Sequence, residues 1–93
     1  MRVRWDETKR KRVLAERDID FASLIDLLYT PYIEDQRSEQ PEQYRIIGFA
    51  NGKLTTFIVE YRLDEIGEYI WTITAWRSTK QERKDYEETV YGN

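Results

Sequence analysis

The sequence predicts a small α+β fold: an antiparallel sheet, built from a hairpin and flanking strands, with two N-terminal helices and one C-terminal helix. Three observations predict it. The chain opens with a short strand and a capped helix, Asn51-Gly52 joins two strands in its middle, and a capping-box pattern starts a charged helix near its end. The chain has 93 residues, 40% of them hydrophobic, so we expect residues 1–93 to form a single domain with one modest core.

The N-terminal segment predicts a strand from Met1 to Trp5, followed by a helix that Asp6 caps. A second helix is expected from about Asp20 to Tyr29, with Asp18 or Asp20 as its cap, because apolar residues recur there at helical spacing. Pro31 ends this helix, since the residue before a proline is disfavoured in the helical region.

The middle of the chain predicts three further strands. Tyr32-Ile33 is expected to be a brief extended segment, and the polar residues 34–43, which include Pro41, a mobile loop. Strands are then expected over residues 43–49, 53–62 and 68–76. Simple alternation in the last of these places Trp71 and Trp76 on opposite faces, and we expect Trp5, Phe57 and Trp71 to lie in the core.

The C-terminal helix is expected from Lys80 to about Thr89, with Thr79 and Glu82 forming a capping box. Seven of the ten residues 80–89 are charged. Only Tyr86 and Val90 offer apolar contact, which predicts a peripheral, weakly docked and mobile helix.

The composition excludes several kinds of chemistry. Cysteine and histidine are both absent, so the chain has no thiol chemistry, no disulfide and no imidazole base or ligand. The carboxylates show no metal-loop spacing, and we expect neither metal nor cofactor. The charged N-terminus does not resemble a signal peptide and no apolar run could cross a membrane, which predicts a cytoplasmic protein.

Charge is unevenly distributed along the chain. Residues 1–17 hold seven Lys or Arg and three Asp or Glu, whereas residues 18–93 hold eight and fifteen. The basic run Lys9, Arg10, Lys11 and Arg12 therefore offers one place for a phosphate backbone or for an acidic partner segment. Such runs are also typical of a solvated helix face.

Several short motifs resemble the BrnT family of type II toxin–antitoxin toxins, in order and over essentially the whole chain. They are Trp5-Asp6 with Lys9 (W-D-x-x-K), Ile19 with Phe21 (G-I-x-F), Ile47-Gly48, Gly52, Val59 to Arg62, Thr74-Ala75 (S-A), and Thr79, Glu82 and Tyr86 (A-T-x-x-E-x-x-x-Y).

The resemblance implies a RelE/ParE-like fold and a metal-independent ribonuclease toxin that inhibits translation by cleaving RNA. It also implies a ribbon-helix-helix antitoxin as partner. Contact with DNA would come only through the toxin–antitoxin complex, which represses its own operon. A homodimer, through an exposed sheet edge or aromatic surface, is a further expectation for the isolated chain.

The sequence departs from the family at positions that bear on catalysis. Arg17-Asp18 stands where the family usually has His-Gly, Gln43 where arginine is common, and Trp76 where an arginine follows S-A. Arg77 comes one residue later, so it replaces that arginine only if the strand has already ended, because neighbouring strand residues point to opposite faces.

Candidate site residues follow from the needs of RNA cleavage, which requires a base and cations to stabilise the phosphorane. We expect Arg62, Arg77 and Arg17 to form a phosphate clamp if they converge on one side of the sheet. Glu16, Glu60 or Tyr61 would then serve as base, and the run Lys9 to Arg12 would contact RNA. The alternative for Arg62 is a structural ion pair with Asp64 or Glu65.

Two alternatives to the toxin remain open from sequence. One is a catalytically inactive BrnT-like binding module or co-repressor partner of an antitoxin, which the missing histidine and the displaced arginine favour. The other is an α+β protein with only superficial likeness to toxins. The aromatic residues Tyr44, Tyr61, Tyr69, Trp71 and Trp76 are candidates either for base stacking or for the core.

Overall fold

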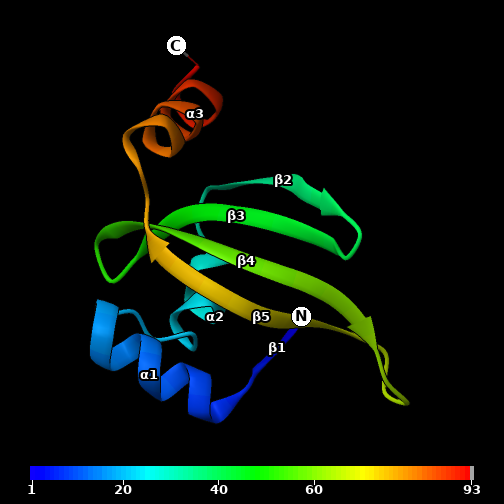
Figure 1. The fold of residues 1–93 in the computed structure, drawn as a ribbon. Coiled ribbons are helices and arrows are strands. Elements are labelled where there is room, and N and C mark those ends of the chain that lie inside the picture. Colours follow the sequence, from blue (N-terminus) through cyan, green and yellow to red (C-terminus); the bar gives the residue numbers. More distant parts are fainter. Residues whose placement is uncertain (93) are drawn as a thin grey trace.

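The computed structural model describes residues 1–92. Its elements follow the order β1 (Arg2–Trp5), α1 (Glu7–Arg17), α2 (Ser23–Leu27), β2 (Tyr32–Glu39), β3 (Glu42–Ala50), β4 (Lys53–Leu63), β5 (Glu68–Arg77) and α3 (Lys80–Tyr91). The strands form one five-stranded sheet in the order β1-β5-β4-β3-β2 (Figure 1).

The sheet is mixed, which corrects the expectation of a purely antiparallel one. β1 pairs with β5 in parallel, and all other neighbours are antiparallel. The pairing of β4 with β5 is antiparallel, as the sequence predicts for the central strands. The chain can lay β1 beside β5 because α1, α2 and three strands separate them in sequence, whereas a parallel pair cannot be joined by a tight turn.

The N-terminal helices begin and end at polar groups. Asp6 accepts a hydrogen bond from the Lys9 N–H at 3.0 Å, which confirms it as the cap of α1. Asp18 ends α1 in the left-handed conformation, with φ of 57°, and caps no second helix. Asp20 instead accepts from the Ala22 N–H at 2.9 Å in a local turn, so α2 is shorter than the predicted helix 20–29.

The expected loop over residues 34–43 is wrong, because most of it is strand. β2 extends to Glu39 and pairs with β3, and Pro41 lies in the short turn between them. The strand was hidden in the sequence because β2 is an edge strand whose residues are mostly exposed, so it lacks the alternation of apolar and polar residues. By contrast, the predicted Asn51-Gly52 turn is confirmed, with positive φ at both residues.

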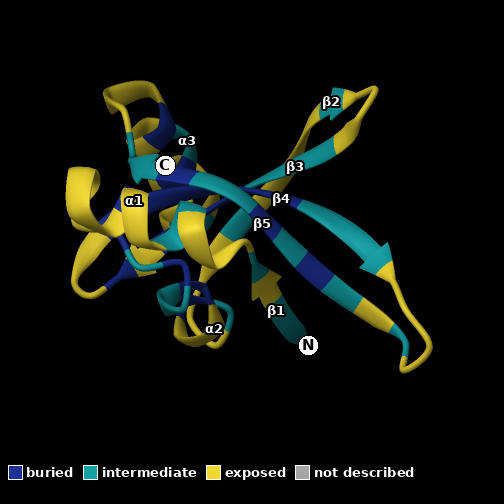
Figure 2. Ribbon diagram, turned by 60° about the horizontal axis from the view of Figure 1, so that its bottom comes forward, coloured by how far each residue is buried: buried dark blue, intermediate teal, exposed yellow. Residues whose placement is uncertain are grey.

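The sheet has one well-covered face and one largely open face. The main core lies between the sheet and α1 and α2, and includes the fully buried Phe21, Leu24 and Phe57. A smaller cluster of Ile47, Leu54 and Tyr86 lies beneath α3. The far ends of the β2–β3 and β4–β5 hairpins project away from the helices and are mostly exposed or half-buried (Figure 2).

The C-terminal helix covers only one end of the second face. The predicted capping box is present, since the Glu82 N–H donates to Thr79 Oγ1 at 3.1 Å and the Thr79 N–H to the Glu82 carboxylate at 2.9 Å. Tyr86 anchors the helix, and its hydroxyl donates to the Pro31 carbonyl at 3.0 Å. We name the remainder of this face, beyond α3, the open face.

Gly48 permits the close approach of α2 to the sheet. A Cβ at this position would lie 2.9 Å from Leu27 Cδ2 and 3.1 Å from Tyr32 Cβ. We predict that Gly48→Ala lowers the free energy of unfolding by about 1–3 kcal/mol, since an overpacked core must shift its neighbours.

Urea denaturation monitored by tryptophan fluorescence measures this change. Gly92→Ala is the matched control, because a Cβ there meets nothing within 4 Å and only the positive φ of 76° opposes it. Equal destabilisation by the two variants would contradict the packing argument.

Candidate nucleic-acid interface

A β-bulge in β5 decides which side chains reach the open face. The β4–β5 register shifts between Ile58 and Val59, so Trp76 pairs with Thr56 while Trp71 pairs with Glu60. Thr56 and Glu60 lie an even number of residues apart on β4, so both tryptophans lie on the same face. The alternation expected from the sequence, which separates Trp71 from Trp76, is therefore wrong.

The open face carries a row of aromatic rings, each covered by an arginine. Arg62 Cζ lies 4.7 Å from the ring centroid of Trp71, and Arg37 Cζ lies 5.4 Å from that of Trp76. Tyr69, two residues before Trp71, contacts both arginines of β1; Arg4 lies 5.0 Å and Arg2 5.4 Å from its centroid. Trp71 is half-buried here, so its expected place in the core is wrong, whereas Phe57 is confirmed there.

Glu60 and Arg62 form the pair on this face that has acid–base potential. The Arg62 guanidinium donates to Glu60 Oε1 at 2.7 Å, and the Gln43 amide donates to Oε2 at 3.0 Å. Hydrogen bonds from Gln43 and Arg62 hold the pKa of Glu60 below its usual value. Arg62 therefore has an ion-pair partner, but that partner is Glu60 and neither Asp64 nor Glu65.

A hollow of about 360 Å³ lies where the open face meets α3, between Arg37, Arg45 and Trp76. Beneath it the buried Glu82 carboxylate accepts from the Trp76 indole N–H and the Thr56 hydroxyl, both at 3.0 Å. Burial acts to raise the pKa of Glu82, but the Thr79 N–H and these donors outweigh it, and the pKa is lowered.

Arg17 and Arg77 come together on the other face, where both hold α1 against the sheet. Arg17 donates to the Ala75 carbonyl at 2.8 Å, and Arg77 donates to the Asp18 carbonyl and to Thr55 Oγ1, each at 2.7 Å. β5 continues through Arg77, so this residue lies opposite Trp76 and does not replace the arginine of the family motif.

The three-arginine clamp is not formed. Arg77 pairs with Thr55, and Arg62 lies seven residues further along β4, a separation of about 23 Å at 3.3 Å per residue. The two positions also lie on opposite faces of the sheet. Strand register, which the sequence does not specify, separates them.

The basic run lies on α1, away from the open face. Arg10 is occupied by ion pairs with Glu7 and Asp20, the latter at 3.2 Å. Lys11 and Arg12 are exposed, as is Glu16, which lies 4.0 Å from Arg12 on the outer side of the helix. Lys9 and Arg12 border a shallow depression at the start of α1.

Tyr61 is poorly suited to act as a base. Its side chain lies on the face opposite Glu60, and its hydroxyl donates to Glu34 at 2.6 Å. Burial and this carboxylate raise the pKa of Tyr61, so a phenolate is disfavoured at neutral pH. Of the three candidate bases, only Glu60 lies beside a cation on the open face.

Sequence reasoning missed Arg2, Arg4, Arg37 and Arg45 as members of this surface. Arg2 and Arg4 alternate along β1 with Val3 and Trp5, a period-two signal that assigns them to one face once β1 is placed. Arg37 carries no such signal, because it lies at the register shift in β2. Within residues 1–92, no cluster of three carboxylates is placed to hold a metal ion, and none of the helices is both long and apolar enough to cross a membrane.

A five-stranded mixed sheet with two helices on one face and a third at one end of the other defines a compact α+β fold. The structure resembles the 1.1 Å crystal structure of the Brucella abortus ribonuclease toxin BrnT, with a TM-score of 0.68 and 22% sequence identity over 86% of this chain and 99% of that chain. No protein-family model and no curated protein sequence matches the chain. The comparison shows that the fold is BrnT-like, as the sequence motifs implied.

The charge on Glu82 should make stability depend on pH. Because the pKa of Glu82 is lower in the folded state, its contribution is present above pH 4.5 and is lost as the pH falls below that value. We predict that Glu82→Gln lowers the free energy of unfolding by about 1–3 kcal/mol at pH 7, and by less at pH 3.

Urea denaturation at the two pH values measures the difference. Glu88→Gln, at an exposed position of the same helix, serves as the control and should leave stability nearly unchanged. Indistinguishable effects of Glu82→Gln and Glu88→Gln at pH 7 would refute the assigned role of the buried carboxylate.

Proposed function

We propose that this protein is a ribonuclease toxin of a type II toxin–antitoxin system and that it binds single-stranded RNA across the open face. The observation that carries the proposal is the row of arginine–aromatic pairs on a BrnT-like scaffold. Successive bases stack on aromatic rings while cations follow the backbone, which is the general design of single-strand binding surfaces. Tyr69 and Trp71 are two residues apart on one strand, about 6–7 Å, which suits an extended strand of bases.

The biological setting is part of the same proposal. Residues 1–93 act as one RelE/ParE-like domain in the cytoplasm and inhibit translation by cleaving RNA. A ribbon-helix-helix antitoxin neutralises the toxin, and the pair contacts operator DNA through the antitoxin. Support for this setting comes from the sequence motifs and from the fold shared with a ribonuclease toxin.

The proposed chemistry centres on Glu60 and Arg62. A phosphate bound by Arg62 competes with Glu60 for the guanidinium, which frees the carboxylate and raises its pKa toward that of a useful base. Glu60 takes the proton of the 2′-hydroxyl as the 2′ oxygen of the ribose bonds to phosphorus. The bond from phosphorus to the 5′ oxygen breaks, and Tyr69, the register partner of Arg62, protonates that oxygen. Glu60 then releases its proton to water, from which Tyr69 is reprotonated. The products are a 2′,3′-cyclic phosphate and a 5′-hydroxyl.

A second candidate function is RNA binding without cleavage. It is favoured by the engagement of Arg17 and Arg77 with carbonyl oxygens and by Trp76, which offers a stacking surface and no charge. In this case the chain would be a binding module or co-repressor partner of an antitoxin. The two candidates share the open face and differ in whether Glu60, Arg62 and Tyr69 cleave the bound RNA.

For RNA binding, we predict that Trp71→Ala and Arg62→Ala each weaken affinity for a fluorescent 12-nucleotide single-stranded RNA by about 1–3 kcal/mol. Affinity should also fall steeply as salt rises. Fluorescence anisotropy measures both effects. Arg12→Ala removes the same charge from α1 and should bind like the wild type; the reverse pattern would place RNA on the basic helix.

For cleavage, we predict that expression of the wild type arrests growth and that Glu60→Gln relieves the arrest while RNA binding is retained. The purified wild type should produce 2′,3′-cyclic phosphate ends, detected by mass spectrometry, and Glu60→Gln should reduce their rate at least about 100-fold. Arg83→Ala, on α3, is the charge control. A wild type that binds RNA but neither cleaves it nor arrests growth would reject the toxin in favour of the binding module.

A further inference from the structure

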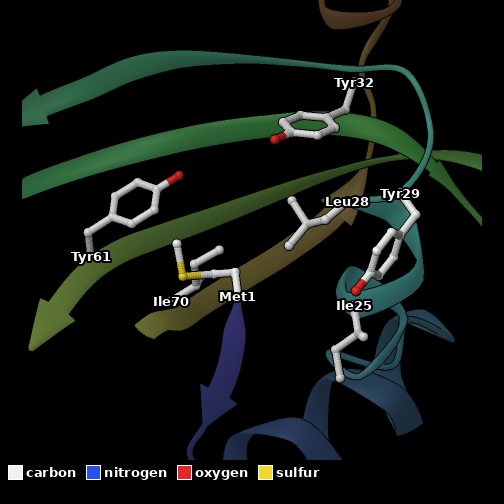
Figure 3. Close-up of a pocket in the computed structure, with 7 residues that line it drawn as sticks. All are labelled: Met1, Ile25, Leu28, Tyr29, Tyr32, Tyr61 and Ile70. Atoms are coloured by element: carbon white, nitrogen blue, oxygen red, sulfur yellow. The ribbon is translucent and has the colours of Figure 1, made fainter. Parts of the chain in front are cut away.

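An apolar groove lies on the face of the sheet opposite the open face, at the end that α1 leaves uncovered. Ile25, Leu28 and Tyr29 form one wall, from α2 and the turn after it, and Met1 and Tyr61 line the sheet side (Figure 3). The cavity has a volume of about 210 Å³. It is separated from the RNA-binding surface proposed above by the thickness of the sheet.

The groove exposes side chains that a free surface rarely displays together. Tyr29 is 85% exposed, Met1 65% and Ile25 40%. Grouped apolar exposure of this kind around a hollow is typical of an interaction site. Leu27 packs closely over Gly48, which places α2 against the sheet beside the groove.

The rim of the groove is acidic. Asp26 follows Ile25 on α2, and Glu34 accepts the hydrogen bond of Tyr61, whose ring packs edge-on against Tyr44. The hydroxyl of Tyr44 donates to a second carboxylate, Glu42, at 2.8 Å.

The segment that supplies most of the groove is also acidic. Residues 18–44, which supply most of the groove, hold seven Asp or Glu and a single basic residue, Arg37. That arginine lies over Trp76 on the opposite face of the sheet. The segment that supplies most of the groove is therefore rich in carboxylates.

We infer that this groove binds an amphipathic basic segment of a partner protein. Apolar side chains of the segment would enter between Ile25, Tyr29 and Tyr61, and its Lys or Arg residues would pair with Asp26 and Glu34. This is helix-in-groove recognition, in which apolar anchors give affinity and charge selects the partner. The acidic rim disfavours RNA, so the surface has a role that the open face cannot serve.

A second copy of this chain fits the groove less well. Its basic surface is α1, where Leu14, 37% exposed, is the one large apolar side chain exposed to solvent. A single leucine offers one apolar anchor, whereas an amphipathic segment offers several. The inference goes beyond the proposed function and does not require RNA cleavage.

The test uses designed peptides and the full chain. A 14-residue Leu/Lys peptide with apolar residues at helical spacing is titrated by calorimetry at physiological salt, beside a Leu/Glu peptide of the same pattern. A third peptide has the Leu/Lys composition in scrambled order. We expect the patterned Leu/Lys peptide to bind at least about tenfold more tightly than either of the others.

The variants locate the binding site. Ile25→Asp and Tyr29→Ser should each weaken binding of the Leu/Lys peptide about tenfold, and Glu34→Gln about threefold. Leu14→Asp makes the same kind of change at an equally exposed position of α1 and should have no effect. Because Tyr29 is largely exposed, Tyr29→Ser should leave the fold intact, so a loss of binding in this variant is not due to misfolding.

Three results would overturn the inference. Equal binding of the Leu/Lys and Leu/Glu peptides would remove the role of charge, and equal loss in Leu14→Asp and Ile25→Asp would remove the role of the groove. A concentration-dependent dimer in sedimentation, abolished by Ile25→Asp, would assign the groove to a second copy instead. RNA binding by Ile25→Asp should match the wild type, so failure of this inference is distinct from failure of the proposed function.

Discussion

The organisation of this protein depends on the bulge that β5 forms opposite Ile58 and Val59. Ile70 and Ala75 both lie in the main core although five residues separate them, which a regular strand does not allow. One inserted residue changes the phase of the strand and satisfies both positions. The same change brings Trp71 and Trp76 to the open face together. Core packing and the candidate RNA surface are thus two consequences of one irregularity.

Two groups of arginines have different physical roles in this protein. Arg17 and Arg77 donate to backbone carbonyls and fasten α1 to β5. On the open face, four arginines lie instead over aromatic rings: Arg2, Arg4, Arg37 and Arg62. Arg2 and Arg4 also pair with Asp64, and Arg62 pairs with Glu60. The second arrangement is suited to ligand exchange, since a phosphate can replace the Glu60 partner of Arg62 without disturbing the core. On the opposite face, the groove beside α2 combines apolar groups with carboxylates, so it differs in chemical character from the open face.

Much of the fold could be predicted from local sequence because its signals are local. Asp6, Thr79 with Glu82, and Asn51-Gly52 each specify a helix start or a turn through contacts within a few residues. β2 was missed because an edge strand needs no apolar face, and its pairing depends on β3 rather than on its own residues. The parallel pairing of β1 was missed because its residues predict a strand but not the strand that it pairs with.

The candidate site was harder to predict, because side chains from β1, β2, β4 and β5 meet only through strand register. The one-residue bulge in β5 moves Trp71 onto the open face. Beyond the bulge the strand continues regularly to Arg77, so Arg77 faces α1. Arg62 and Glu60 were recognised as individual candidates, but their pairing with each other required the i, i+2 geometry of a strand end. The expected arginine clamp is not formed because it was inferred from residue type and charge alone. The register of β4 against β5, which separates Arg62 from Arg77, could not be inferred from them.

The central claim is that both tryptophans of β5 belong to one RNA-binding surface. The indole N–H resonances of Trp5, Trp71 and Trp76 in a ¹⁵N-labelled sample, followed during titration with single-stranded RNA, test it most directly. The account predicts that the resonances of Trp71 and Trp76 move together while that of Trp5, on the covered face beside α1, stays in place. Movement of Trp5 alone, or of only one of the two β5 indoles, would contradict it.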